Sequence, residues 1–219
     1  MRYMIGVLAG LAGTPAPEAF APAKSAGRGI MCETDTRQAQ QGSAWERKGK
    51  PMELQIRPYT ADDIKAMVRI WNEVVEAGDA FPQVTPLTEQ NADEFFSAQT
   101  ATMVADVNGI IFGMYILHPN GIGRCAHIAN ASFAVASASR GLGLGRKLVE
   151  NCIETCGKKG FRGLQFNAVV ASNEAAQHLY ESMGFTKVGM IPGGFINGLG
   201  GYEDMFVYYI DTLDTAQPC

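Results

Sequence analysis

The chain has few of the residues that build metal sites or disulfide frameworks. Its 219 residues include five cysteines and three histidines. The cysteines, at positions 32, 125, 152, 156 and 219, are odd in number and form no C-x-x-C pair. Zinc sites and disulfide frameworks need closer and more numerous groupings. The sequence therefore predicts reduced cysteines in a cytoplasmic protein, and no metal site.

Long apolar runs and an excess of positive charge are also missing. No stretch of about 18 apolar residues occurs, so the sequence predicts no membrane-spanning helix. The formal net charge is −4, without the basic stripe that is typical of nucleic-acid binders. Neither nucleic acid nor a membrane is therefore an expected partner, and the acidic balance mildly favours an amine or another cationic ligand.

Residues 1–51 differ in composition from the rest of the chain. They carry seven basic and four acidic residues, against 11 and 18 in residues 52–219, and show no sustained helical or strand period. Such a stretch buries too little apolar surface to offset the entropy of ordering it. A signal peptide with an A-x-A-like site at residues 19–21 is one interpretation. The favoured one is a poorly structured N-terminal extension, with the folded domain over residues 52–219.

The hydrophobic pattern of residues 52–219 predicts an α/β domain. Helical periodicity, with caps, predicts helices over residues 60–78, 88–97, 144–160 and 173–183. Apolar, β-rich runs predict strands over residues 54–57, 102–107, 110–117, 126–135, 164–170, 186–191 and 202–210. Asn108-Gly109 between two such runs predicts a hairpin. Hairpins in the first half and crossover helices in the second predict a mixed sheet with helices on both faces.

The segment from Arg140 to Arg146 is the most informative in the chain, with the sequence R-G-L-G-L-G-R. It follows a predicted strand and opens a predicted helix, so unpaired amides and the positive end of the helix dipole meet there. Glycines allow a bulky phosphate to approach the backbone, and two arginines add positive charge. The spacing fits neither a Rossmann G-x-G-x-x-G nor a P-loop. The segment predicts an anion site, with a plain tight turn as the alternative.

This segment resembles the R/Q-x-x-G-x-G/A signature of the GCN5-related N-acetyltransferase (GNAT) family. A second segment, from Asn173 to Phe185, is similar to the family's N-x-x-A-x-x-L-Y-x-x-x-G-F pattern. With the strand order, the resemblance covers roughly residues 54–210. It implies the GNAT fold, whose central, mostly antiparallel and splayed sheet has six to seven strands and about four flanking helices. It also implies transfer of acetyl from acetyl-CoA to an amine by direct attack in a ternary complex.

The resemblance implies where acetyl-CoA binds. The loop amides would hold the pyrophosphate, the strand before the loop would pair with the pantetheine arm, and Asn173 would reach the same arm unless it only caps its helix. The implied cofactor-binding residues are Phe133, Ala134, Val135, Arg140, Gly141, Leu142, Gly143, Leu144, Gly145, Arg146 and Asn173.

The resemblance also implies a proton donor. Tyr180 matches the tyrosine that protonates the departing thiolate in many relatives, and a phenol with a pKa near 10 stays protonated at pH 7. A packed aromatic residue is the alternative. Many relatives carry a catalytic carboxylate on the fourth strand, but residues 126–133 contain none. His127 is a substitute base or, more simply, a histidine at the rim.

Two asparagines in predicted strands suggest an acceptor site. Asn130 and Asn167, with Asn173 six residues later, are similar to an asparagine set in the proline-analogue N-acetyltransferases of yeast, where such residues hold the substrate or the developing oxyanion. Structural amides are the alternative. The resemblance implies an acceptor such as an amino acid or proline analogue. A protein N-terminal or lysine acetyltransferase and a non-catalytic acyl-CoA sensor stay open, as does a homodimer.

Overall fold

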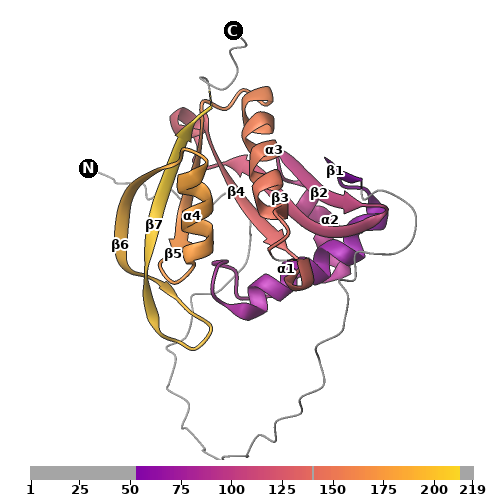
Figure 1. The fold of residues 1–219 in the computed structure, drawn as a ribbon, viewed down its shortest axis with the longest axis horizontal. Helices are drawn as coiled ribbons and strands as arrows, with labels where there is room; N and C mark the ends of the chain where they lie inside the picture. Colours follow the sequence, from indigo (N-terminus) through magenta and orange to yellow (C-terminus); the bar gives the residue numbers. More distant parts are fainter. Residues whose placement is uncertain (1–52, 140, 213–219) are drawn as a thin grey trace, which may run out of the picture. The chain divides into compact units, whose positions relative to one another are not determined.

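The computed structural model describes residues 53–139 and 141–212, which form one mixed sheet with helices on both faces (Figure 1). The predicted extension over residues 1–51 lies outside the described residues. The strands are β1 (Leu54–Pro58), β2 (Ala101–Val107), β3 (Ile110–Pro119), β4 (Ile128–Val135), β5 (Gly163–Val170), β6 (Thr186–Ile196) and β7 (Tyr202–Asp211). The α-helices are α1 (Ile64–Ala77), α2 (Glu89–Ser97), α3 (Leu144–Lys158) and α4 (Glu174–Ser182). Single 3-10 turns are η1 (Ala61–Asp63), η2 (Gly123–Cys125) and η3 (Ser137–Ser139).

The strand order is β1-β2-β3-β4-β5-β7-β6. β4 and β5 pair in parallel, and each of the other neighbouring pairs is antiparallel. The predicted mixed, mostly antiparallel sheet flanked by four helices is therefore confirmed.

Two apolar cores lie on the two faces of the sheet. On one face, α1 buries Met67, Ile70 and Trp71 against residues of β3 and β4 such as Met114. On the other, residues of α3 and α4 pack on the alternate positions of the same strands. Because successive residues of a strand point to opposite faces, residues 129, 131, 133 and 135 of β4 face α3 and α4. Residues 130, 132 and 134 face the side of α1.

Three predicted strand boundaries are wrong by two residues or more, and one of them is the end of β3, which lies at Pro119 rather than Leu117. The strand expected over residues 126–135 begins at Ile128, because the η2 turn continues with a hydrogen bond from the Ala126 amide to the Gly123 carbonyl. The strand expected to end at Ile191 continues to Ile196, through Pro192 and two glycines expected to form a loop. A shift in register against β7 accommodates these residues.

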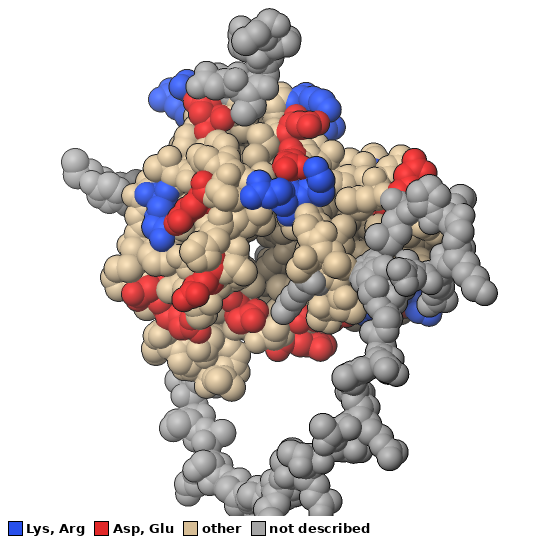
Figure 2. All heavy atoms as spheres, viewed as in Figure 1, with Lys and Arg blue, Asp and Glu red and all other residues tan. Residues whose placement is uncertain are grey.

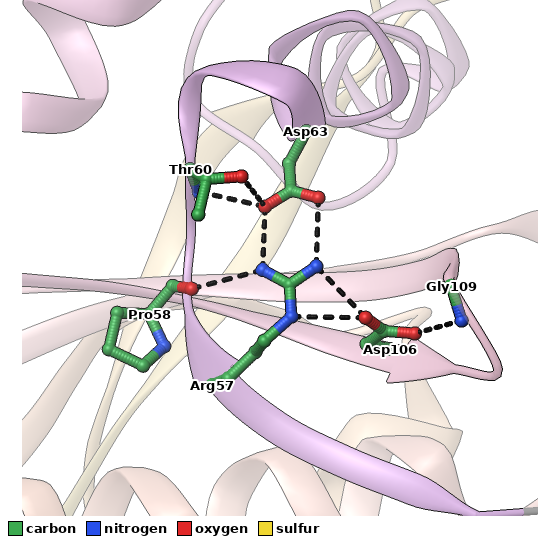
Figure 3. A network of polar contacts seen from close by, with 6 residues as sticks. All are labelled: Arg57, Pro58, Thr60, Asp63, Asp106 and Gly109. Atoms are coloured by element: carbon green, nitrogen blue, oxygen red, sulfur yellow. Dashed lines mark hydrogen bonds and ion pairs between the residues drawn. The ribbon is translucent and has the colours of Figure 1, made fainter.

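A polar network joins the start of the domain to the sheet (Figure 3). The Arg57 guanidinium on β1 donates to both carboxylate oxygens of Asp63, at 2.7 and 3.0 Å. It also donates to Asp106 at the end of β2, at 2.9 and 3.0 Å. These hydrogen bonds hold the pKa of Asp63 below its usual value. Asp106 in turn accepts from the Gly109 amide in the hairpin turn.

Candidate active site

The parallel pair β4–β5 separates soon after it forms. Its paired positions are Ile128 opposite Gly163 and Ala129 opposite Leu164. From Asn130 onward, the edge of β4 that faces β5 has no strand partner in the described chain. Figure 1 shows the two strands diverging from this paired end. The structure therefore places a row of backbone hydrogen-bonding groups beside an opening, as the resemblance implied for residues 133–135.

A helix N-terminus lies at the end of β4, beyond the η3 turn. Gly141 and Gly143 have φ values of 82° and 76°, so both occupy the left-handed region that favours glycine. A Cβ atom added to either glycine would meet nothing within 4 Å, so this side of the loop is open. The amides of Leu144, Gly145 and Arg146 have no acceptor among the described residues. The amides of Gly145 and Arg146 are therefore available to an anion.

A buried hydroxyl supports a ligand at this loop. Ser139 is 1% exposed, and its Oγ atom has no hydrogen-bond partner among the described residues. An unpaired buried hydroxyl costs about 1–3 kcal/mol. This orphan group, the bare amides and the open glycine face all fit a bound diphosphate. Sequence reasoning missed Ser139, because a serine before a glycine loop carries no distinguishing local signal.

The structure describes one of the two arginines that the sequence predicted at the anion site. Arg140 lies outside the described residues. Arg146 is exposed, and its Nη2 atom donates to Ser182 Oγ at the end of α4, at 2.6 Å. This hydrogen bond connects the N-terminal turn of α3 to α4, and it leaves the other guanidinium nitrogens available to a phosphate.

A row of aromatic rings crosses the opening on the side of α3 and α4. Phe133 of β4 lies edge-on to Phe166 of β5, with 5.8 Å between ring centroids. The Tyr180 ring on α4 follows at 4.5 Å from Phe166. Burial raises the pKa of Tyr180 above its usual value, and its hydroxyl has no hydrogen-bond partner among the described residues. A protonated phenol without a partner is suited to donate a proton to a bound ligand.

Asn173 is the N-cap of α4. Its side-chain oxygen accepts a hydrogen bond from the Ala176 amide at 3.2 Å, and the predicted helix begins one residue later, at Glu174. The side-chain nitrogen has no acceptor in the described part of the chain. Asn173 therefore has the helix-capping role that the sequence offered as an alternative. Its side-chain nitrogen stays available as a hydrogen-bond donor.

The two predicted strand asparagines lie on the opposite face of the sheet from Tyr180. Asn130 is half-buried on β4, and its side chain makes no hydrogen bond with the described residues. Asn167 is exposed on β5, where it accepts from Gln165 at 2.7 Å and donates to Asn120 beyond β3. The structure therefore brings Asn167 into an amide cluster, and it places the two asparagines on either side of the opening.

The substitute base considered above is not on β4. His127 is exposed and precedes the strand, and its carbonyl accepts from the Arg162 amide. A different acidic residue lies near the end of β4. Glu73 of α1 accepts a hydrogen bond from the Ser137 amide at 3.0 Å. Sequence reasoning missed this contact because its partners are 64 residues apart.

The surface of the molecule is hollowed where the end of β4 lies between α3 and α4 (Figure 2). In residues 53–139 and 141–212, no group of three or more potential ligands could hold a metal ion. Within the same residues, no helix is long and apolar enough to span a bilayer.

Comparison with known proteins agrees with this geometry. Residues 65–185 match the Acetyltransferase (GNAT) family. The N-acetyltransferase aca1 of Schizosaccharomyces pombe is 30% identical over 155 residues, which cover 63% of this chain and 74% of aca1. A GCN5-related N-acetyltransferase from Kribbella flavida is 36% identical with a TM-score of 0.67, over 72% of this chain and 97% of that one.

A third protein shares the fold at lower identity. The phosphinothricin acetyltransferase of Sinorhizobium meliloti, solved in complex with acetyl-CoA, has a TM-score of 0.67 at 21% identity, over 76% of this chain and 93% of that one. The family match spans the helix N-terminus, the opening and Tyr180. The chain belongs to the acetyltransferase (GNAT) family, and it is an acyltransferase with acetyl-CoA as its co-substrate.

Proposed function

We propose that this protein transfers acetyl to the amine of a small molecule, such as an amino acid or proline analogue. The observation that carries the proposal is the separation of β4 from β5 beside a helix N-terminus whose amides are bare. The similarity to a phosphinothricin acetyltransferase supports a small-molecule acceptor. So does the polar character of Asn130 and Asn167 on the face opposite the proton donor.

The residues at the opening have two proposed roles. One set binds acetyl-CoA, and the other set, on the opposite face of the sheet, holds the acceptor. Acetyl-CoA would supply an activated acetyl carbonyl at the opening. The amides of Gly145 and Arg146 would hold its diphosphate, and the free edge of β4 over residues 133–135 would pair with its pantetheine arm. These contacts fix the acetyl group relative to β4, so that the acceptor needs only to be placed against it.

Tyr180 and the strand asparagines would complete the reaction. The neutral amine nitrogen forms a bond to the acetyl carbon, the carbon–sulfur bond breaks, and Tyr180 gives its phenolic proton to the departing sulfur. The amine proton leaves to water, and the Tyr180 phenolate takes a proton back from water. Asn130 and Asn167 would hold the acceptor on the opposite face, where Asn120 orients the Asn167 amide.

We also propose that the protein is located in the cytoplasm. Cys125, Cys152 and Cys156 are free thiols in the described chain, and the last two are buried residues of α3. Free cysteines suit a reducing compartment.

A thiol-release assay tests the proposal. The protein is supplied with acetyl-CoA and a panel of free amino acids, proline analogues and polyamines, and the products are identified by mass spectrometry. We expect saturable release of CoA with at least one small amine. Calorimetric titration with acetyl-CoA alone is the companion measurement. Saturable binding without turnover on any amine would instead indicate a non-catalytic acyl-CoA sensor.

A further inference from the structure

A histidine lies at the corner where the sheet opens, and it has no role in the proposed function so far. His118, near the end of β3, is directly opposite Asn130 in the antiparallel pairing of β3 with β4. The side chains of directly opposed residues lie on the same face of a sheet, with Cβ atoms about 4.5–5.5 Å apart. Asn130 is the first residue of β4 beyond the last position that pairs with β5. His118 therefore lies beside the narrow end of the opening.

The alternation of β3 places His118 on the face that the acceptor would use. Met114 and Ile116 belong to the core beneath α1, and His118 follows them at the same period of two. Tyr180 packs against the core on the other face. The proposed function puts the amine on the face of Asn130 and the proton donor on the face of Tyr180. A base at position 118 would therefore accept a proton on one face of the sheet while Tyr180 donates one on the other.

The hydrogen bond of the His118 ring leaves one nitrogen free. Nδ1 lies 2.9 Å from the carbonyl oxygen of Pro119. A carbonyl oxygen only accepts hydrogen bonds, so the proton of the neutral ring is on Nδ1 and the lone pair is on Nε2. Nε2 has no hydrogen-bond partner among the described residues, and the side chain is half-buried. The ring is thus held in the tautomer that a proton acceptor needs.

The carboxylates closest to the opening are committed to other partners. β4 itself carries none. Glu73 accepts from the Ser137 amide beyond the far end of β4. Glu203 lies beyond the end of β5, where hydrogen bonds from Ser172 and Asn197 hold the pKa of its carboxyl below the usual value. Both acids lie toward the wide end of the opening, and Glu203 is weakened as a base.

We propose that His118 is the general base that takes the proton from the attacking amine. As the bond between the amine nitrogen and the acetyl carbon forms, one proton of that nitrogen passes to His118 Nε2. The imidazolium then gives this proton to water, so His118 is unchanged after each turnover. This inference rests on the proposed function, and it assigns the role of the missing β4 carboxylate to the strand beside it.

The test compares His118→Ala and His118→Gln with His127→Ala. Glutamine keeps a side-chain N–H group for the Pro119 carbonyl but has no basic nitrogen. His127 is exposed and precedes β4, so its substitution is the matched control. Each protein, in excess over acetyl-CoA, is assayed in single turnovers with the free amine that the unaltered protein acetylates fastest. The assays are repeated with added imidazole. Calorimetric titration with acetyl-CoA and a thermal melt check the co-substrate site and the fold.

We expect both His118 variants to transfer acetyl about 100-fold more slowly, with an unchanged acetyl-CoA dissociation constant and melting temperature. His127→Ala should keep the full rate. Imidazole should raise the rate of His118→Ala saturably, by at least about tenfold, because it restores a base in the vacated space. It should not change the rate of the unaltered protein or of His127→Ala.

A full rate in either His118 variant would overturn this inference alone, and a full rate in His118→Gln would show that the hydrogen bond to Pro119 is what matters. A slow His118→Ala that imidazole does not restore would overturn it as well. If the unaltered protein acetylates no amine, the proposed function fails and the inference with it.

Discussion

The Tyr180 ring on α4 lies 4.5 Å from the Phe166 ring on β5, at a tilt of 44°. Phe166 also stacks on Phe185 at 4.9 Å, so the phenol is held by packing rather than by a hydrogen bond to its hydroxyl. This arrangement separates the two functions of the tyrosine. The ring stabilises the fold, and the hydroxyl is left for a ligand.

Substitution Tyr180→Phe is expected to lower kcat by about 100-fold, the scale of a lost general acid. The acetyl-CoA dissociation constant and the melting temperature should barely change, because the ring contacts remain. Steady-state kinetics, calorimetric titration and a thermal melt measure the three quantities. An unchanged kcat would remove Tyr180 from the reaction, whereas a lower kcat together with weaker acetyl-CoA binding would indicate a disturbed site.

Substitution Gly145→Asp separates helix stability from anion binding. A carboxylate in the first turn of α3 is favourable to the helix by roughly 0.3–1 kcal/mol. An added Cβ would make an ordinary 3.6 Å contact with Leu179. The same charge would oppose a diphosphate at the loop by about 2 kcal/mol for charges about 8 Å apart, which is roughly 30-fold in affinity.

We therefore expect Gly145→Asp to melt no lower than the unaltered protein while its acetyl-CoA dissociation constant rises by about 30-fold. Gly145→Asn, which is nearly isosteric and uncharged, is the control and should retain most of the affinity. Equal losses in both variants would show that bulk rather than charge matters. Unchanged affinity in both would place the diphosphate elsewhere.

Local signals in the sequence predicted most of the elements. Asn108 and Gly109 have φ values of 53° and 84°, as a two-residue hairpin turn requires. Thr88 caps α2 by accepting from the Asn91 amide, and Gly78 ends α1 in the left-handed region. Each of these features depends on residues that are only a few positions apart in the sequence. A local sequence pattern is therefore enough to predict it.

The site could be predicted only in part. The glycine loop and Tyr180 lie in short motifs, and the family match spans both. The point at which β4 leaves β5 and the contact of Asn167 with Asn120 depend on partners distant in sequence. No local periodicity encodes such contacts. The binding and catalytic roles of the individual residues stay predictions.

Gln83, in the loop after α1, carries a buried side-chain oxygen with no hydrogen-bond partner among the described residues. Substitution Gln83→Met removes this acceptor at similar side-chain length, so the free energy of unfolding should rise by about 1 kcal/mol. Urea denaturation measures the change. Gln83→Glu, which buries a charge at the same place, is the matched control and should be less stable than the unaltered protein. A loss of stability in Gln83→Met would mean that the oxygen has a partner in solution.

The Arg57 network makes stability depend on pH. Arg57 is 25% and Asp63 8% exposed in their side chains, and the guanidinium lowers the pKa of Asp63 from its usual value near 3.8. A carboxyl with a lowered folded-state pKa stabilises the protein above its unfolded pKa, and this contribution is lost as the pH falls through the folded pKa. Substitution Arg57→Met should therefore cost about 2 kcal/mol at pH 7, because two carboxylates lose their charged donor.

The same cost should shrink as the pH falls below 3.8 toward the lowered folded-state pKa of Asp63, because protonation of this carboxyl removes the need for the guanidinium. Urea midpoints of the two proteins, measured from pH 7 to pH 3, follow this convergence. Arg69→Met is the control, because the Arg69 side chain is 61% exposed and its ion pair with Glu73 is 3.8 Å long, so its removal should cost less than about 0.5 kcal/mol. A difference between Arg57→Met and the unaltered protein that stays constant down to pH 3 would mean that packing of the arginine stem, rather than its charge, stabilises this corner of the fold.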